Sequence, residues 1–193
     1  LRVTGSFTLS VAEADMAPSI ALALMHGVLG QVFLGLMVAI AVVTSRRWLA
    51  APPAEPRASL GGDRSLQLWL VATLLVQLVL GAAQRHLAWG LIIHITLAAV
   101  VTMLAVIAGA RAWGLYHGSW PVQRLGQALI GVVSVQVALG IAALAVTQGR
   151  AIVGSPTAAE VTLATAHQAT GAALLALGVM LALWTRRLFE AGR

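Results

Sequence analysis

Five apolar stretches, each long enough to cross a membrane as a helix, dominate this 193-residue sequence. A helix needs about 20 such residues to span the hydrocarbon core. None of the five contains Asp or Glu, and Arg85, at the end of the second, is their only arginine. The whole chain is 60% hydrophobic and only 9% charged, which is membrane rather than soluble composition. We therefore expect an all-α fold, a polytopic bundle of five transmembrane helices. The stretches are Pro18–Thr44, Leu66–His86, Trp89–Ala110, Leu125–Thr147 and Val161–Thr185.

The basic residues predict how the chain is oriented. All twelve are arginines, most of them between the apolar stretches, so a membrane explains the net charge of +6 better than a nucleic-acid partner does. Cytoplasmic segments of membrane proteins carry an excess of basic residues. With the N-terminus outside and the C-terminus inside, nine arginines lie inside and three outside, and we expect this orientation in a bacterial or archaeal inner (plasma) membrane. The inner nine are Arg46, Arg47, Arg57, Arg64, Arg111, Arg124, Arg186, Arg187 and Arg193; the outer three are Arg2, Arg85 and Arg150.

The stretches divide the chain into three parts. Residues 1–44 form an outer segment and the first span, residues 45–65 a cytoplasmic linker, and residues 66–193 a four-helix bundle. The linker contains three prolines and a glycine pair, which predicts flexibility. The chain starts at Leu1, and no signal-peptide pattern precedes the first apolar stretch. We expect helices to be missing before it.

Three histidines lie within the predicted spans at matching depths. His26, His94 and His167 are about eight, five and six residues into the first, third and fifth spans, which run in the same direction. At about 1.5 Å per residue, all three lie roughly 8–12 Å below the outer boundary. His86 ends the second span near the same layer. Ionisable residues inside a membrane are costly and usually functional, so the pattern predicts a shared site.

A small residue follows each histidine one turn deeper, at Gly30, Ala98 and Gly171. Because positions i and i+4 share a helix face, these residues could give a flat macrocycle room against an imidazole. Close helix packing is the simpler explanation of any single pair. Three pairs at one depth favour a cofactor.

Haem is the cofactor that fits these residues best. Helical bundles build haem sites from histidines on facing helices. The chain has no cysteine, which excludes thiolate-bound zinc, iron–sulfur clusters and covalent haem attachment. Buried carboxylates, which many metal sites and proton relays use, are not expected in the spans.

A short internal repeat and an arginine complete the pattern. The segment from Val76 to Gly81 (VQLVLG) matches that from Val135 to Gly140 (VQVALG), which suggests two related halves with a site between them. Gln31, Gln77, Gln136 and Gln168 either orient the histidines or, as we expect from membrane bundles in general, bond between helices. Arg85 and His86 could pair with haem propionates, although Arg85 could equally reach the lipid headgroups.

Several motifs, in order, resemble the haem A synthase family, whose fold is two four-helix bundles with paired histidines. The segments MHGVLGQVF (from Met25), QLVLGAAQRH (from Gln77), IHITLA (from Ile93) and AHQATGA (from Ala166) are similar to the family's fourth, fifth, sixth and eighth helices. The family often has arginine where Ile95 stands. The resemblance covers nearly the whole chain.

The resemblance implies specific roles. His94 and His167 would be the axial ligands of haem b in the C-terminal bundle of residues 66–193, and His26 would belong to a catalytic site where a haem O methyl is oxidised to the formyl of haem A. Electrons would pass between the two haems across the bundle interface. The family's first three helices, with the partner histidine and an acidic residue, have no counterpart in this sequence. The implied partners are membrane lipids, the haem substrate, the missing helices, haem O synthase and terminal oxidase subunits, in the service of cytochrome oxidase assembly.

Two other functions remain open from the residues alone. One is a cytochrome b-like electron-transfer subunit, or a haem-binding assembly subunit, of a respiratory complex. The other is a small-solute transporter, which is less favoured because no stretch is broken by proline or charged at its middle.

Overall fold

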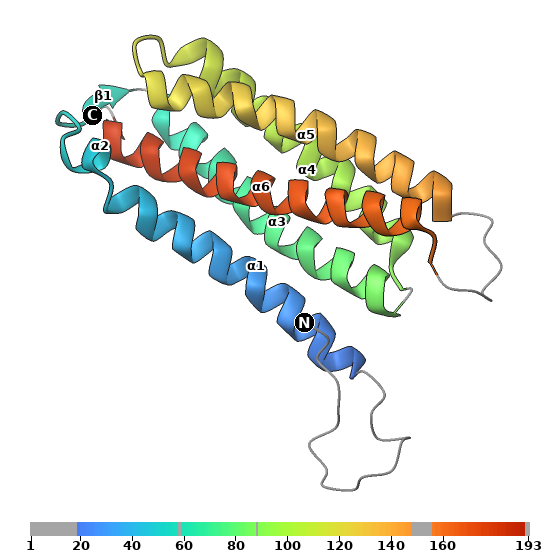
Figure 1. Cartoon of the computed structure of the whole chain (residues 1–193). Helices are drawn as coiled ribbons and strands as arrows, with labels where there is room; N and C mark the ends of the chain where they lie inside the picture. The colour runs from blue at the N-terminus through green and yellow to red at the C-terminus, as the bar shows by residue number, and fades with distance from the viewer. Residues whose placement is uncertain (1–18, 58, 88, 148–155, 192–193) are drawn as a thin grey trace, which may run out of the picture.

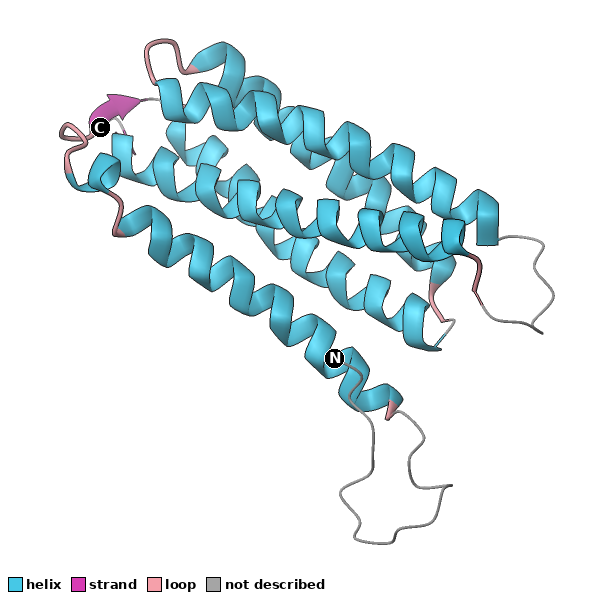
Figure 2. Cartoon of the chain, viewed as in Figure 1, coloured by secondary structure: helices cyan, strands magenta, loops and turns pink. Residues whose placement is uncertain are grey.

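The computed structural model describes residues 19–57, 59–87, 89–147 and 156–191. Within these ranges the chain forms six helices and a sheet of two very short strands, and helices dominate (Figure 2). In chain order the elements are α1 (Ile20–Val43), α2 (Arg46–Leu49), β1 (Glu55–Arg57), α3 (Leu60–Leu87), α4 (Leu91–Leu115), α5 (Trp120–Thr147), α6 (Ala158–Leu188) and β2 (Phe189–Ala191).

Five of these helices, all except α2, are long and apolar enough to cross a membrane. This confirms the expected all-helical bundle with five candidate spans. Three of them begin before the apolar stretches do: α3 begins six residues before Leu66, α5 five residues before Leu125 and α6 three residues before Val161. The start of α6 is set by a capping box in which Thr157 and Glu160 exchange side-chain-to-backbone hydrogen bonds, satisfying amides that the first turn leaves without partners.

The helices α3, α4, α5 and α6 form an antiparallel four-helix bundle (Figure 1). Each packs against the next, and α3 closes the ring by packing against α6, so α4 and α6 are diagonally opposite. The short connections of α4 to its neighbours explain why adjacent helices run in opposite directions. The first helix, α1, lies outside this ring against α6 and α3 and runs in the same direction as α4 and α6.

The linker expected to be flexible over residues 45–65 is largely ordered, so that expectation was wrong. It contains α2, β1 and the first turns of α3, and β1 pairs in parallel with the C-terminal strand β2. Arg187 donates hydrogen bonds to the carbonyl oxygens of Ala51 and Pro52, and Arg64 donates to that of Phe189. Long-range hydrogen bonds therefore fix a segment whose local sequence favours flexibility.

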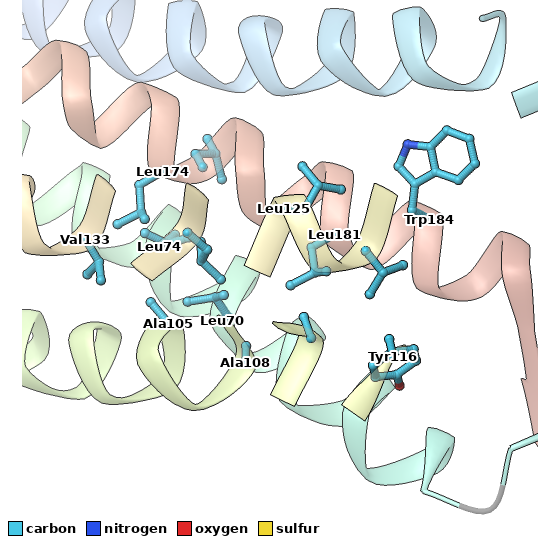
Figure 3. Packing of buried hydrophobic residues seen from close by; sticks show 14 of the residues in the cluster. Leu70, Leu74, Ala105, Ala108, Tyr116, Leu125, Val133, Leu174, Leu181 and Trp184 are labelled. Atoms are coloured by element: carbon cyan, nitrogen blue, oxygen red, sulfur yellow. The ribbon is translucent and has the colours of Figure 1, made fainter. Parts of the chain in front are cut away.

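The tightly packed core occupies only one half of the bundle. Its buried side chains come from the first half of α3 and α5 and the second half of α4 and α6, the end where the chain ties α2 and β1 to its C-terminus (Figure 3). Two helices also approach each other closely here, where Gly109 of α4 faces Gly126 of α5. The core residues labelled in Figure 3 are Leu70, Leu74, Ala105, Ala108, Tyr116, Leu125, Val133, Leu174, Leu181 and Trp184.

A buried polar cluster closes the packed end. The Asp63 side chain is 2% exposed and pairs with Arg111, 2.5 Å between Nε and Oδ1. Tyr116 donates its hydroxyl hydrogen to the other carboxylate oxygen at 2.6 Å, and the ring of Tyr116 meets Phe189 edge-on. Because Asp63 was expected in a solvated linker, this buried carboxylate is a feature that the sequence reading missed.

Candidate cofactor site

Four polar side chains lie in the other half of the bundle. Gln77 of α3, His94 of α4, Gln136 of α5 and His167 of α6 are all half-buried in this half, where few apolar side chains are fully buried. His94 is the fourth residue of α4 and His167 the tenth of α6. These helices are diagonally opposite in the bundle. The structure therefore places two of the three histidines expected to share a site in the same half of one bundle.

The His167 ring is held by α5 at both of its nitrogens. Its Nδ1 lies 3.2 Å from the backbone carbonyl oxygen of Gln136, and its Nε2 lies 3.3 Å from the side-chain nitrogen of the same residue. Since a carbonyl can only accept, Nδ1 carries the hydrogen and Nε2 keeps its lone pair. The Thr170 hydroxyl donates to Gln136 Oε1, which turns the amide nitrogen toward the ring.

The His94 ring has a similar partner but fewer bonds. The side-chain nitrogen of Gln77 lies 3.4 Å from His94 Nε2 and donates to the backbone carbonyl of His94 at 3.0 Å. Two buried atoms here, His94 Nδ1 and Gln77 Oε1, have no hydrogen-bond partner. Buried polar atoms are nearly always bonded, so each such atom calls for an explanation.

The internal repeat supplies the same two residues to each ring. Gln77 and Gly81 of α3 contact His94 as Gln136 and Gly140 of α5 contact His167. A Cβ at Gly81 would lie 3.2 Å from His94 Cε1, and one at Gly140 would lie 3.0 Å from His167 Cε1. The glycines thus let each ring approach the neighbouring helix. The six-residue repeat was the sequence signal for this pairing, but we expected its glutamines mainly to join helices.

The small residues one turn below the histidines make less room beside the imidazole rings than we expected. Gly171 makes room for the Gln136 amide, whose nitrogen would lie 3.2 Å from an added Cβ, while Gly30 has no neighbouring atom within 4 Å of that position. The space beside the two rings comes from the glycines of the adjacent helices instead.

The remaining predicted site residues are Arg85, His86 and His26, and they differ in their relation to this pair. Arg85, at the end of α3, donates a 2.5 Å hydrogen bond to Oε1 of Gln168, the residue after His167. His86 is half-buried at the same helix end. His26 is exposed on α1, outside the four-helix bundle, and is not brought to the pair.

The residues present fit a haem. Two imidazoles from diagonal helices, each with an Nε2 contacted only by an amide at 3.3–3.4 Å, can give those lone pairs to an iron. These contacts are longer than typical hydrogen bonds of 2.7–3.2 Å, so a metal bond can replace them at little cost. The two buried atoms without a partner, His94 Nδ1 and Gln77 Oε1, and the two glycines, Gly81 and Gly140, also lie at these rings. Among the described residues, no three His, Cys, Asp or Glu side chains gather in a metal-binding group, so two histidines are the donor set on offer.

Two open grooves lie elsewhere, one at the start of α4 and one between α3 and α4. The larger, of about 510 Å³, and the smaller, of about 450 Å³, are lined by exposed apolar side chains such as Ile92 and Ile93. None of the four site residues lines them, and their composition suits contact with lipid.

Comparison with known proteins adds no relative: no family model, curated protein or solved structure matches this chain.

Proposed function

We propose that this membrane-embedded chain binds a b-type haem between His94 and His167, and that it is a haem A synthase-like oxidoreductase. The observation that carries the proposal is the duplicated arrangement of glutamine, glycine and histidine at the loosely packed end of the bundle. In the structure the Nε2 of each ring is contacted only by an amide nitrogen at 3.3–3.4 Å, which is a weak partner for a polar atom within a membrane. Iron ligation gives both rings a strong partner.

The chain's own residues have distinct tasks in this proposal. His94 and His167 hold the iron through Nε2, and the Gln136 carbonyl orients the His167 ring through Nδ1. Gly81 and Gly140 let the rings lie close to α3 and α5. Arg85, already reaching across to α6, supplies a guanidinium for a propionate. The haem, when bound, supplies one-electron redox chemistry.

The positions of the arginines support an orientation with the N-terminus outside. In that orientation the packed end, with Arg46, Arg64, Arg111 and Arg187, faces the cytoplasm, and the histidine end faces outward. We place the protein in a bacterial or archaeal plasma membrane.

The haem A synthase part of the proposal rests on the sequence resemblance and on His26. His26 is exposed on a helix outside the bundle, where a second haem could reach it only with ligands from elsewhere. Oxidation of haem O to haem A would take place there, and the haem at His94 and His167 would carry electrons. Further helices that supply a partner histidine, haem O synthase and terminal oxidase subunits are the partners that this proposal implies.

An electron-transfer or haem-binding assembly subunit is the second candidate. The site held within α3–α6 has two histidines and no carboxylate among its described contacts, which is sufficient for electron transfer but supplies no acid or base. In this alternative, His26 does not bind a haem substrate.

The test is a reduced-minus-oxidised optical spectrum of the purified chain, followed by extraction and identification of its haem. We expect the spectrum of a six-coordinate, low-spin b-type haem. The double variant His94→Ala with His167→Ala should lose it, while His117→Ala, which removes an exposed histidine at the packed end, should keep it. A wild-type chain without haem, or a double variant with an unchanged spectrum, would refute haem binding at this site.

A separate assay distinguishes the two functions. Membranes containing the chain are supplied with haem O, and the extracted haems are analysed for haem A. Formation of haem A that His26→Ala abolishes supports the enzyme. A low-spin haem b without any haem A supports the electron-transfer subunit.

A further inference from the structure

We propose that the two axial positions of this site are unequal: His167 is the fixed ligand, and His94 is the exchangeable one, whose side of the iron opens to a small uncharged ligand such as carbon monoxide or imidazole. This inference rests on the proposed haem binding and deepens it. It comes from the difference in how α5 and α3 hold their histidines.

His167 is anchored independently of any metal. The carbonyl of Gln136 accepts from Nδ1, and that bond selects the tautomer with a free lone pair on Nε2. A ligand histidine bonded in this way has a fixed ring and is a stronger electron donor to the metal. The Thr170 hydroxyl, which donates to Gln136 Oε1, orders the adjacent amide as well.

His94 lacks both of these supports. Its Nδ1 is buried without a partner, so the ring is held only by the 3.4 Å contact between its Nε2 and the Gln77 amide, which iron binding at Nε2 would replace. The residue three positions after His167 is Thr170, whereas the residue three positions after His94 is Leu97, which has no hydroxyl to order the Gln77 amide. Gln77 Oε1 is accordingly a second buried atom without a partner.

The difference has a direct consequence for ligand exchange. An imidazole that is not held in the right orientation rebinds iron less readily once it is released. The axial position that it leaves therefore stays open for more of the time. Exchange should therefore occur on the His94 side, while His167 keeps the haem in the bundle.

A pair of matched variants tests the inference in the full-length chain. His94→Gly and His167→Gly carry the same helix penalty and each remove one ring. Both are purified from haem-replete cells, and haem content, spin state and carbon monoxide binding are measured. His94→Gly should keep at least about half of the wild-type haem in a high-spin form that binds carbon monoxide and returns to low spin with added imidazole. His167→Gly should lose haem by about 10-fold or more, the scale expected when ligand orientation is lost.

Equal haem loss in the two variants, or the reverse order, would overturn the inference. The wild-type spectrum separates this failure from a failure of the proposed function. A wild-type chain without low-spin haem would refute both haem binding and the inequality of the two histidines. Low-spin haem in the wild type, with equal haem loss in the two glycine variants, would refute only the inequality.

A milder pair keeps the test valid if either glycine variant does not fold. Thr170→Val is nearly isosteric and removes the hydroxyl that orders Gln136, whereas Thr96→Val removes an exposed hydroxyl of α4 that bonds only its own helix. Thr170→Val should lower the affinity for added haem about 10-fold, and Thr96→Val should leave it unchanged. Equal affinities in both variants would contradict the anchoring role.

Discussion

Replacing Gly126 with alanine should push α4 and α5 apart at their closest approach. A Cβ at this position would lie 2.5 Å from the carbonyl oxygen of Gly109 and 2.7 Å from the backbone nitrogen of Trp113. Both neighbours are backbone atoms, so neither can rotate away. Ordinary contact begins near 3.4 Å, and the difference of 3.4 − 2.5 Å requires a helix displacement of about 0.9 Å.

The expected cost follows from that displacement and from a matched control on the same helix. Overpacking a close-packed interface costs about 1–3 kcal/mol, while alanine in place of glycine in a helix contributes about 1 kcal/mol in the other direction. Gly131→Ala makes the same change at an exposed position of α5 with no atom within 4 Å of the added Cβ. The helix-propensity contribution cancels between the two variants, so Gly126→Ala should be less stable than Gly131→Ala by about 1–3 kcal/mol.

The assay is the free energy of unfolding in mixed micelles, measured by titration with SDS and followed by tryptophan fluorescence and far-UV circular dichroism. Gly131→Ala should be at least as stable as the wild type. If Gly126→Ala is equally stable, α4 and α5 do not meet at Gly109 and Gly126, and the helix arrangement described above is incorrect.

Three further predictions concern the polar contacts. Gln67→Leu should lower the free energy of unfolding by about 1 kcal/mol, because it breaks the 3.0 Å hydrogen bond to Thr185 within the membrane region; a double-mutant cycle with Thr185→Val checks whether the two effects are coupled. Asp63→Asn should lower the free energy of unfolding, because it removes the carboxylate that pairs with Arg111. Breaking a fully buried pair costs about 3 kcal/mol or more, and the loss here should be smaller because the Arg111 side chain is 39% exposed. The same SDS titration measures the loss, and an unchanged free energy of unfolding would mean that the ion pair contributes nothing. Gly140→Ala should reduce haem content several-fold, because a Cβ 3.0 Å from the His167 ring displaces it from its carbonyl partner; pyridine haemochrome analysis of the purified variant reports the loss, and full haem content would contradict the proposed site.

The five spans could be predicted from sequence because length and apolar composition alone decide them. The helix ends could not. Asp63 in the first turn of α3 pairs with Arg111 of another helix, and the preceding segment is held by hydrogen bonds from Arg187 to Ala51 and Pro52. Such long-range pairings leave no mark in the local pattern.

For the site, sequence indicated which histidines share a depth but not what they contact. A helix that is apolar on all sides carries little periodicity from which to infer which face meets a neighbour. The rotation that directs His94 toward Gln77, and His167 toward Gln136, could therefore not be read from hydropathy. The exposed position of His26 depends in the same way on how α1 packs against α6 and α3.

Low-temperature electron paramagnetic resonance of the oxidised, purified chain reports the iron coordination most directly. We predict a low-spin ferric signal typical of two axial imidazoles, converted to a high-spin signal in His94→Gly. A wild-type chain that shows only high-spin iron, or a low-spin signal that persists without change in His94→Gly and His167→Gly, would contradict ligation by these two residues.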